Sequence, residues 1–254
     1  MSIYDTIGVR TIINAKGAST RVSGALLAPE VTAAMQEAAQ YCVDMAEIQA
    51  AASKIIAEAT GAEAGIVTSG AAAGLLLGAA ACVAGLDPAK MARLPDTTGM
   101  KNEVVMVRSQ RNQYDHAIRS AGVHIVEVGL PDRFAGAGVR DAEPWEIAAA
   151  VTERTAAIVY VANASARPMI EEVARVANSK HVPLLVDAAA QLPPAANLRR
   201  FLAAGADLVA FSGGKAIGGP QAPASSVAGA TSLRRSFSNS TSTSPGSNGR
   251  QPRV

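Results

Sequence analysis

The sequence predicts an α/β domain with a mainly parallel sheet flanked by helices. Short apolar or β-branched runs alternate with amphipathic segments of helical period along residues 61–222. The runs are apolar throughout, which is typical of strands buried on both faces. The chain of 254 residues is 49% hydrophobic, enough to cover such a sheet with helices. We therefore expect a doubly wound arrangement.

Two helices are predicted before the sheet. Apolar residues recur at three- and four-residue spacing in residues 29–41 and again in residues 45–59. Gly61 is placed to close the second helix. We expect residues 1–60 to form an N-terminal helical segment that precedes the main domain at residues 61–222.

Five strands are predicted in the main domain, with polar groups at several of their carboxyl ends. The strands cover residues 64–68, 104–107, 157–161, 183–186 and 207–211, and helices cover residues 70–82, 114–121 and 169–178. In open α/β sheets, ligands bind beyond the carboxyl ends of the strands. The groups at those ends are Ser69-Gly70, Asp187 and residues 212–215.

Composition argues against several other classes of protein. Cys42 and Cys82 show no CxxC spacing and no histidine cluster accompanies them, so we expect two buried free thiols and no metal site. Apolar stretches fall short of the ~20 residues of a membrane helix, and residues 1–10 lack a signal-peptide pattern. The expected location is cytoplasmic, without a membrane partner.

The charge of the chain is unevenly distributed. Residues 223–254 hold four of the 23 basic residues and no acid, which leaves 19 basic against 21 acidic residues in the body. The body is therefore slightly acidic despite a formal net charge of +2. A nucleic-acid-binding surface is not indicated.

The most informative residues are a lysine and an aspartate that follow neighbouring strands. Lys215 lies in the glycine-flanked Ser-Gly-Gly-Lys turn, and Asp187 ends the apolar run 182–186. A lysine held in such a turn can act as a nucleophile. A carboxylate at the end of a buried strand requires a partner. The alternatives are a surface lysine and a helix N-cap.

Two other features suit a bound phosphate and a flat ring. Residues Ser69, Gly70 and Ala71 form a small-residue turn at a helix start, where N–H groups favour an anion, and Ser212 adds a hydroxyl. The alternative is that this turn only caps the N-terminus of the helix. Tyr114 and His116 supply flat side chains after the next strand, and we favour His116 slightly for stacking.

Together these groups match what pyridoxal 5'-phosphate (PLP) requires of a protein: an amine, an anion for the pyridinium nitrogen, phosphate donors and a flat neighbour. The residues also resemble the selenocysteine-synthase-like group of fold-type-I PLP enzymes, with the ammonia-lyase branch the nearest. The resemblance covers residues 8–222. It is carried by residues 9–17, 68–74, 94–102, 187–194 and 211–221, among which SGGK followed by GGPQ is the specific motif.

The resemblance implies a role for each candidate. Lys215 would form the internal aldimine and Asp187 would meet the ring nitrogen. Ser69, Gly70 and Ser212 would lie near the phosphate, and Asn14 and Arg21 would be candidates for the substrate side. The expected substrate is a small amino acid, and a homo-oligomer is expected.

The last 32 residues depart from the family pattern. Residues 223–254 contain nine serines and little apolar periodicity, which predicts disorder and no contribution to the core. When the third base of each codon becomes the first, permitted codons from about Pro223 can spell the family-like stretch Ser-Gly-Ile-Leu-Cys-Gly-Arg-Arg-Asp-Leu-Ile-Ala. We therefore expect a frameshifted tail and a missing small C-terminal domain.

Three functions remain open from the sequence. The leading one is a PLP-dependent lyase that eliminates ammonia or a β substituent from an amino or sugar amino acid. L-seryl-tRNA(Sec) selenium transfer is the alternative, but the slightly acidic body disfavours a tRNA partner. An inactive truncated product is the third. PLP-dependent racemases and aldolases use the same cofactor-binding groups, so these reactions also stay open.

Overall fold

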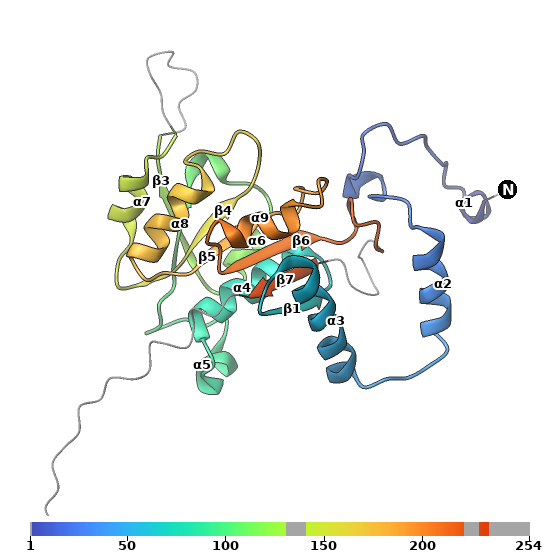
Figure 1. Cartoon of the computed structure of the whole chain (residues 1–254), viewed down its shortest axis with the longest axis horizontal. Coiled ribbons are helices and arrows are strands. Elements are labelled where there is room, and N and C mark those ends of the chain that lie inside the picture. The colour runs from blue at the N-terminus through green and yellow to red at the C-terminus, as the bar shows by residue number, and fades with distance from the viewer. Residues whose placement is uncertain (1, 131–140, 221–228, 234–254) are drawn as a thin grey trace, which may run out of the picture.

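The computed structural model describes residues 2–130, 141–220 and 229–233, the last of these by backbone alone. A seven-stranded sheet forms its centre, with strand order β1-β7-β6-β5-β4-β2-β3 (Figure 1). The strands are β1 Ala64–Thr68, β2 Glu103–Val107, β3 His124–Val128, β4 Thr155–Val161, β5 Leu184–Asp187, β6 Leu208–Ser212 and β7 Gly229–Leu233. Strands β3, β2, β4, β5 and β6 are parallel, which confirms the predicted fold class.

Helices cover both faces of the sheet. The helical elements are α1 Ile3–Thr6, η1 Thr20–Val22, α2 Pro29–Ala38, α3 Met45–Thr60, α4 Ala71–Ala84, α5 Pro88–Arg93, η2 Arg108–Gln110, α6 Asp115–Arg119, α7 Pro144–Ala150, α8 Ile170–Ser179 and α9 Asn197–Ala203. Helices α4 and α6 contribute to the apolar core on one face, and α7, α8 and α9 contribute to the core on the other. The result is a three-layer domain.

The alternating side chains of the central strands fill both cores. In β5, Leu184 and Val186 enter the core beneath α8 and α9, whereas Leu185 enters the core beneath α4. All three are fully buried. This two-sided burial explains why the central strands read as continuous apolar runs. Gly78 lets α4 approach closely, because a Cβ there would lie 3.0 Å from Leu185 Cδ1.

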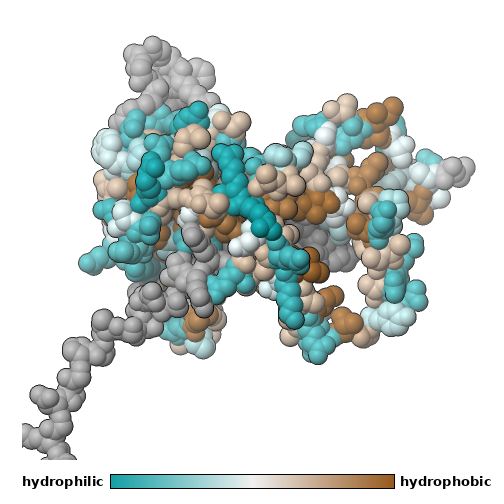
Figure 2. Space-filling model, in the orientation of Figure 1, coloured by the Kyte–Doolittle hydropathy of each residue, from teal (hydrophilic) through white to brown (hydrophobic). Residues whose placement is uncertain are grey.

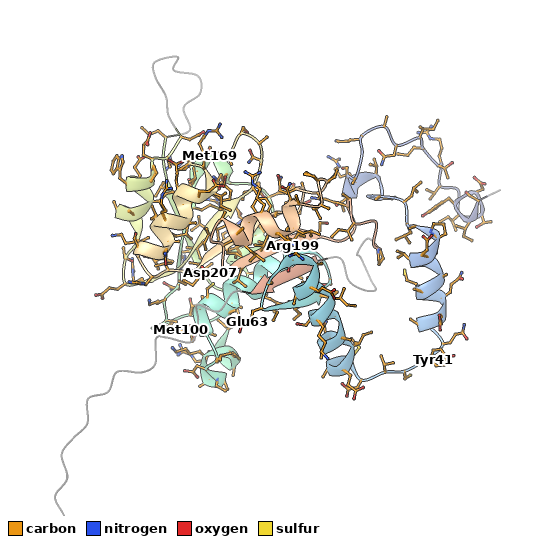
Figure 3. The ribbon with its side chains drawn as sticks, in the orientation of Figure 1. Tyr41, Glu63, Met100, Met169, Arg199 and Asp207 are labelled. Atoms are coloured by element: carbon orange, nitrogen blue, oxygen red, sulfur yellow. The ribbon has the colours of Figure 1, made fainter. Side chains whose placement is uncertain are left out.

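Residues 2–44 form an N-terminal arm, most of which stands apart from the sheet domain (Figure 1). Helix α3 returns to the domain and lies against β1, and Gly61 ends α3 in the left-handed conformation, as predicted. Arg199 of α9 donates from Nε to the carbonyl of Ala59, at 3.1 Å, and so secures the end of α3 (Figure 3). Helices α1 and α2 have no buried residue.

The segment 223–254, for which disorder and no contribution to the core were predicted, contains one strand. Gly229–Leu233 forms β7, which pairs antiparallel with both β1 and β6. The backbone N–H and C=O groups of those two strands need partners, and a short strand of small residues supplies them. The rest of the segment lies outside the described residues, so its predicted disorder stays a prediction.

The expectation of two buried thiols is also wrong for Cys42, which is exposed in the connection between α2 and α3. Cys82 on α4 is partly buried, and burial raises the pKa of its thiol to about 12. A thiol with that pKa stays protonated at neutral pH and is a poor nucleophile. Within the described residues, no helix combines the length and hydropathy needed to cross a bilayer.

Candidate functional site

The carboxyl ends of four strands meet at one edge of the sheet. Asp187 at the end of β5 pairs with Val161 of β4 and with Ala210 of β6. At the other side of β6, Gly229 of β7 pairs with Ser212 and also with Thr68 of β1. The segments that follow β1, β5 and β6 therefore begin side by side, as the predicted site requires.

Asp187 is a buried carboxylate at this edge, with 8% of the residue exposed. Its Oδ1 accepts a hydrogen bond of 3.0 Å from the N–H of Ala189. Burial raises the pKa of the Asp187 carboxyl above its ordinary value, while the Ala189 N–H and the positive charge of Lys215 lower it in part. The ionised form is thus incompletely compensated, and a cationic donor at this position would stabilise it.

Lys215 follows β6 in a compact turn. The Lys215 carbonyl accepts from the N–H of Gly218 at 3.0 Å, and the N–H of Gly219 donates to the carbonyl of Gly213 at 2.8 Å. Lys215 is partly exposed and lies in the wall of a cavity. The glycines close the turn and leave the lysine at its surface, where it can meet a ligand.

The turn between β1 and α4 offers backbone N–H groups to an anion. Gly70 is the N-cap of α4 with φ +126°, a conformation that favours glycine, and it provides no side-chain acceptor to the helix. Ser69 is exposed, Ala71 begins the helix, and Ser212 is half-buried across β7. Helix α4 begins three residues after β1 ends, so its N-terminus, the positive end of the helix dipole, lies at this edge of the sheet.

Two buried or half-buried amides hold the loops of this edge in place. Gln110 is 4% exposed, and its Oε1 accepts from the N–H of Val161 at 2.9 Å. Gln191 donates from Nε2 to the carbonyl of Ala162 at 2.7 Å. Both contacts cross from a neighbouring loop to the end of β4, so they order the site before any ligand arrives.

Tyr114 and His116 occupy different positions. Tyr114 is the N-cap of α6, and it lines the same cavity as Lys215. His116 is exposed and absent from that lining, and its Nδ1 lies 2.9 Å from Nη2 of Arg119. Of these two residues, Tyr114 lines the cavity that contains Lys215, and His116, which the sequence slightly favoured for stacking, does not.

The cavity has a volume of about 280 Å³. It is lined by Ala18, Ser19, Thr20, Arg21, Gln113, Tyr114, Ala190 and Lys215. Lys215, Tyr114 and Arg21 are thus brought together, whereas Ser69, Gly70, Ala71, Ser212 and Asp187 lie at the same sheet edge without lining this cavity. Reasoning from the sequence missed Ala18, Ser19, Thr20, Gln113 and Ala190.

Asn14 has a structural role in the arm. Its Nδ2 donates to the carbonyl of Gly17 at 2.9 Å, and its Oδ1 accepts from the N–H of Lys16 at 2.9 Å. Asn14 therefore shapes the loop that carries Arg21 and does not line the cavity.

Comparisons with known proteins agree with this architecture. The family model described as L-seryl-tRNA selenium transferase matches residues 12–230. D-glucosaminate-6-phosphate ammonia lyase of Salmonella typhimurium is 36% identical over 227 residues, covering 86% of this chain and 58% of that protein. A 5'-C-glycyluridine monooxygenase-decarboxylase of Streptomyces sp is 37% identical, covering 85% of this chain and 54% of that protein.

Solved structures agree as well. The structure of a D-glucosaminate-6-phosphate ammonia-lyase matches with a TM-score of 0.82 and 34% identity, covering 93% of this chain and 62% of that one. A Thermus thermophilus aspartate aminotransferase, at 21% identity and a TM-score of 0.54, shares the fold. The chain spans less than two thirds of the length of these relatives. It belongs to the L-seryl-tRNA selenium transferase family and has the fold of the type I PLP enzymes.

Proposed function

We propose that this chain binds PLP and uses it to eliminate a β substituent from a small amino acid or sugar amino acid, releasing a keto acid and ammonia. One observation carries the proposal. An amine, Lys215, and a buried carboxylate, Asp187, follow two neighbouring parallel strands at the same sheet edge. The 36% identity to an ammonia lyase supports this class of reaction.

The residues of the edge fit the cofactor. Asp187 is buried with an incompletely compensated charge, which suits the protonated ring nitrogen. The start of α4 at Gly70 and Ala71, with the Ser69 and Ser212 hydroxyls, would hold the phosphate. Tyr114 would lie against the ring. When bound, PLP supplies an electron sink next to the substrate carbon that bears the amine.

The chain's own residues would manage the protons. The Nζ of Lys215 would act as the general base and take the proton from the substrate carbon that bears the amine. Asp187 would keep the ring nitrogen protonated throughout. A β-hydroxyl would leave as water, and a second water would release ammonia and the keto acid, so the net reaction needs no oxidant or reductant.

Selenium transfer to a seryl-tRNA is a weaker candidate. The selenium transferase of Nitratidesulfovibrio vulgaris is 26% identical, which is more distant than the ammonia lyase. The body of the chain carries 19 basic and 21 acidic residues, without the excess of positive charge that a tRNA contact requires. We therefore propose a small-molecule substrate.

Covalent trapping tests the cofactor proposal. The chain is incubated with PLP, reduced with borohydride and digested, and the modified lysine is identified by mass spectrometry. We expect the added mass on the peptide containing Lys215 and none on those containing Lys90 or Lys180, which are exposed lysines away from the cavity. Labelling of all exposed lysines alike, or of none, would overturn the proposal.

The proposed partner is a second copy of the chain, held by the N-terminal arm. Large apolar side chains lie exposed along the arm, and Figure 2 shows brown residues gathered there. They include Ile3, Ile7, Ile12, Ile13, Leu26, Tyr41 and Val43. Tyr41 lies far from the sheet domain in Figure 3. Seven large apolar side chains exposed on one short segment suggest a surface that a partner covers, and a symmetric dimer would bury each of them twice.

Charge placed on the arm should therefore weaken self-association. Ile13 is 99% exposed, and burying such a side chain is worth about 1.5–3 kcal/mol. We expect Ile13→Glu to weaken the dimer by roughly tenfold or more in sedimentation velocity experiments. The matched control is Leu86→Glu, at a position 91% exposed in the turn after α4. A wild-type chain that is monomeric at tens of micromolar would contradict the proposal.

A further inference from the structure

We propose that Asp115 is a positioning residue, which fixes the segment that carries Tyr114 to the cavity through ion pairs with Arg111 and Arg119. The inference rests on the proposed function and deepens it, because it names what sets the position of the Tyr114 ring beside the cofactor. Tyr114 lines the cavity, whereas Asp115 lies outside the lining. Asp115 would therefore act on a ligand only through its neighbour.

The backbone of Tyr114 determines where its ring lies. The N–H of Tyr114 donates to Oδ1 of Asn112 at 2.8 Å, and its carbonyl accepts from the N–H of Ala117 at 3.0 Å. The side chain itself is 44% exposed, so little packing restrains it. The position of the ring thus depends on how firmly the main chain of residues 111–115 is held.

Arg111 and Asp115 clamp the two ends of that segment. Nε of Arg111 donates to Oδ2 of Asp115 at 2.5 Å. On the other side of the carboxylate, Oδ1 lies 3.4 Å from Nε of Arg119, one turn further along α6. Both carboxylate oxygens are therefore paired with a guanidinium. Gln113 and Tyr114, which both line the cavity, stand between the clamped ends.

The guanidinium of Arg111 also ties the clamp to the sheet. Its Nη1 donates to Oε1 of Glu127 on β3, and Oε2 of Glu127 accepts from Nε of Arg108 at 2.8 Å. The side chains of Arg111 and Glu127 are 28% and 32% exposed, so water screens these pairs less than it screens pairs on an open surface. One arginine fork thus joins the start of α6 to the edge strand.

Asp115 differs from Asp187 in that the protein already satisfies its charge. Asp115 is 5% exposed. Burial raises the pKa of its carboxyl, but the hydrogen bond from Arg111 and the charges of Arg111 and Arg119 outweigh burial and hold the pKa below its ordinary value. An ionised carboxylate with both oxygens paired needs no cationic ligand. The role left to Asp115 is geometric.

Removing the charge of Asp115 should loosen the segment without unfolding the domain. Helix α6 is also held by Ile118, which is 2% exposed, and by Ala121, both in the core beneath α4. In Asp115→Asn the side chain keeps its shape, but its amide nitrogen cannot accept a hydrogen bond, so it cannot serve both guanidinium groups.

Hydrogen–deuterium exchange of the cofactor-free chain tests the clamp without requiring activity. In Asp115→Asn we expect residues 110–117 to exchange about tenfold faster or more, as for loss of a hydrogen bond between charged groups, and residues of β5 to exchange at the wild-type rate. Arg111→Lys keeps the charge but lacks the fork, so it should have the same effect. Unchanged exchange at residues 110–117 in both variants overturns the inference.

The matched control for the loss of a buried ion pair is Glu103→Gln. Glu103 is 8% exposed and pairs with Arg154 at the start of β2, the opposite edge of the sheet from the cavity. This variant should leave exchange at residues 110–117 unchanged. Equal acceleration there in Glu103→Gln would show general destabilisation and would also overturn the inference.

A double-mutant cycle shows whether Asp115 acts through Tyr114. PLP affinity is measured by equilibrium dialysis. Asp115→Asn should lower the affinity by about tenfold in the wild-type background and by less than about twofold in Tyr114→Ala, because the ring that Asp115 positions is then already absent. An equal loss of affinity in the two backgrounds would contradict the positioning role.

Failure of this inference can be told apart from failure of the cofactor proposal. If borohydride trapping leaves Lys215 unlabelled while Asp115→Asn still accelerates exchange at residues 110–117, the cofactor proposal fails and the clamp on the cavity wall stands. If Lys215 is labelled but exchange at residues 110–117 is unchanged, the cofactor proposal stands and the role of Asp115 is refuted.

Discussion

Replacing Lys215 by alanine is expected to reduce turnover by at least about a hundredfold and to prevent covalent attachment of PLP. A general base contributes roughly 10²- to 10⁴-fold, and the variant also lacks the amine that would hold the cofactor. The measurements are keto acid and ammonia release from amino acids with a β-hydroxyl, and the visible absorbance of the chain after excess PLP is removed.

The variant should fold normally, which makes the result interpretable. Lys215 is partly exposed in a turn whose hydrogen bonds are made by the backbone, so its truncation should change the free energy of unfolding by about 0.5 kcal/mol or less. Lys180→Ala is the matched control. Lys180 is exposed at the C-cap of α8, before β5 begins, and so lies at the opposite edge of the sheet. A Lys215→Ala chain that keeps its absorbance band would refute the assignment.

The parallel core could be predicted because its residues are apolar on both faces. Leu184, Leu185 and Val186 are fully buried, and a polar residue, Asp187, stands where the strand ends. The Ser-Gly-Gly-Lys turn likewise follows directly from the end of β6. Local composition therefore located both residues of the proposed chemistry and placed them at one edge of the sheet.

Two strands escaped prediction for different reasons. In β3, at the edge of the sheet, His124 and Glu127 are exposed, so no uninterrupted apolar run marks the strand. Strand β7 is Gly-Ala-Thr-Ser-Leu, whose composition is that of a loop. Its pairing depends on the unpaired backbone edges of β1 and β6, which are a property of the folded sheet and not of the segment.

The cavity wall could not be predicted for a similar reason. Arg21 lines the same cavity as Lys215 because the arm crosses to the lysine turn, where the Ala25 N–H donates to the Gly214 carbonyl. One backbone hydrogen bond between distant segments leaves no pattern in the sequence. The sequence also could not decide between Tyr114 and His116. Their side chains leave the start of α6 in different directions, and the sequence does not show which direction faces the cavity.

Asp187→Asn should lower the affinity for PLP but should preserve or raise the stability of the cofactor-free chain. The asparagine keeps the shape and can still accept the 3.0 Å hydrogen bond from the Ala189 N–H. It lacks the negative charge that would pair with the ring nitrogen. Breaking a buried ion pair costs about 3 kcal/mol or more, so we expect cofactor affinity to fall by roughly a hundredfold or more, measured by equilibrium dialysis with PLP.

The cofactor-free chain should instead be as stable as the wild type or more stable at neutral pH. Burial raises the pKa of Asp187 in the folded protein, so its contribution to stability is present at low pH and is lost as the pH rises through that raised pKa. Thermal unfolding from about pH 4 upward should show this loss in the wild type and not in Asp187→Asn.

The changes in PLP affinity and in stability together distinguish a carboxylate that binds the cofactor from one that only caps a turn. If Asp187 served only to cap the turn at Ala189, asparagine would replace it in both roles, and PLP affinity would not change. Lost affinity together with unchanged or increased stability of the cofactor-free chain can arise only if the protein keeps a costly buried charge for a cationic partner. Reduced stability of the Asp187→Asn chain at neutral pH would show that the carboxylate is already satisfied within the protein, and the ring nitrogen would then need another partner.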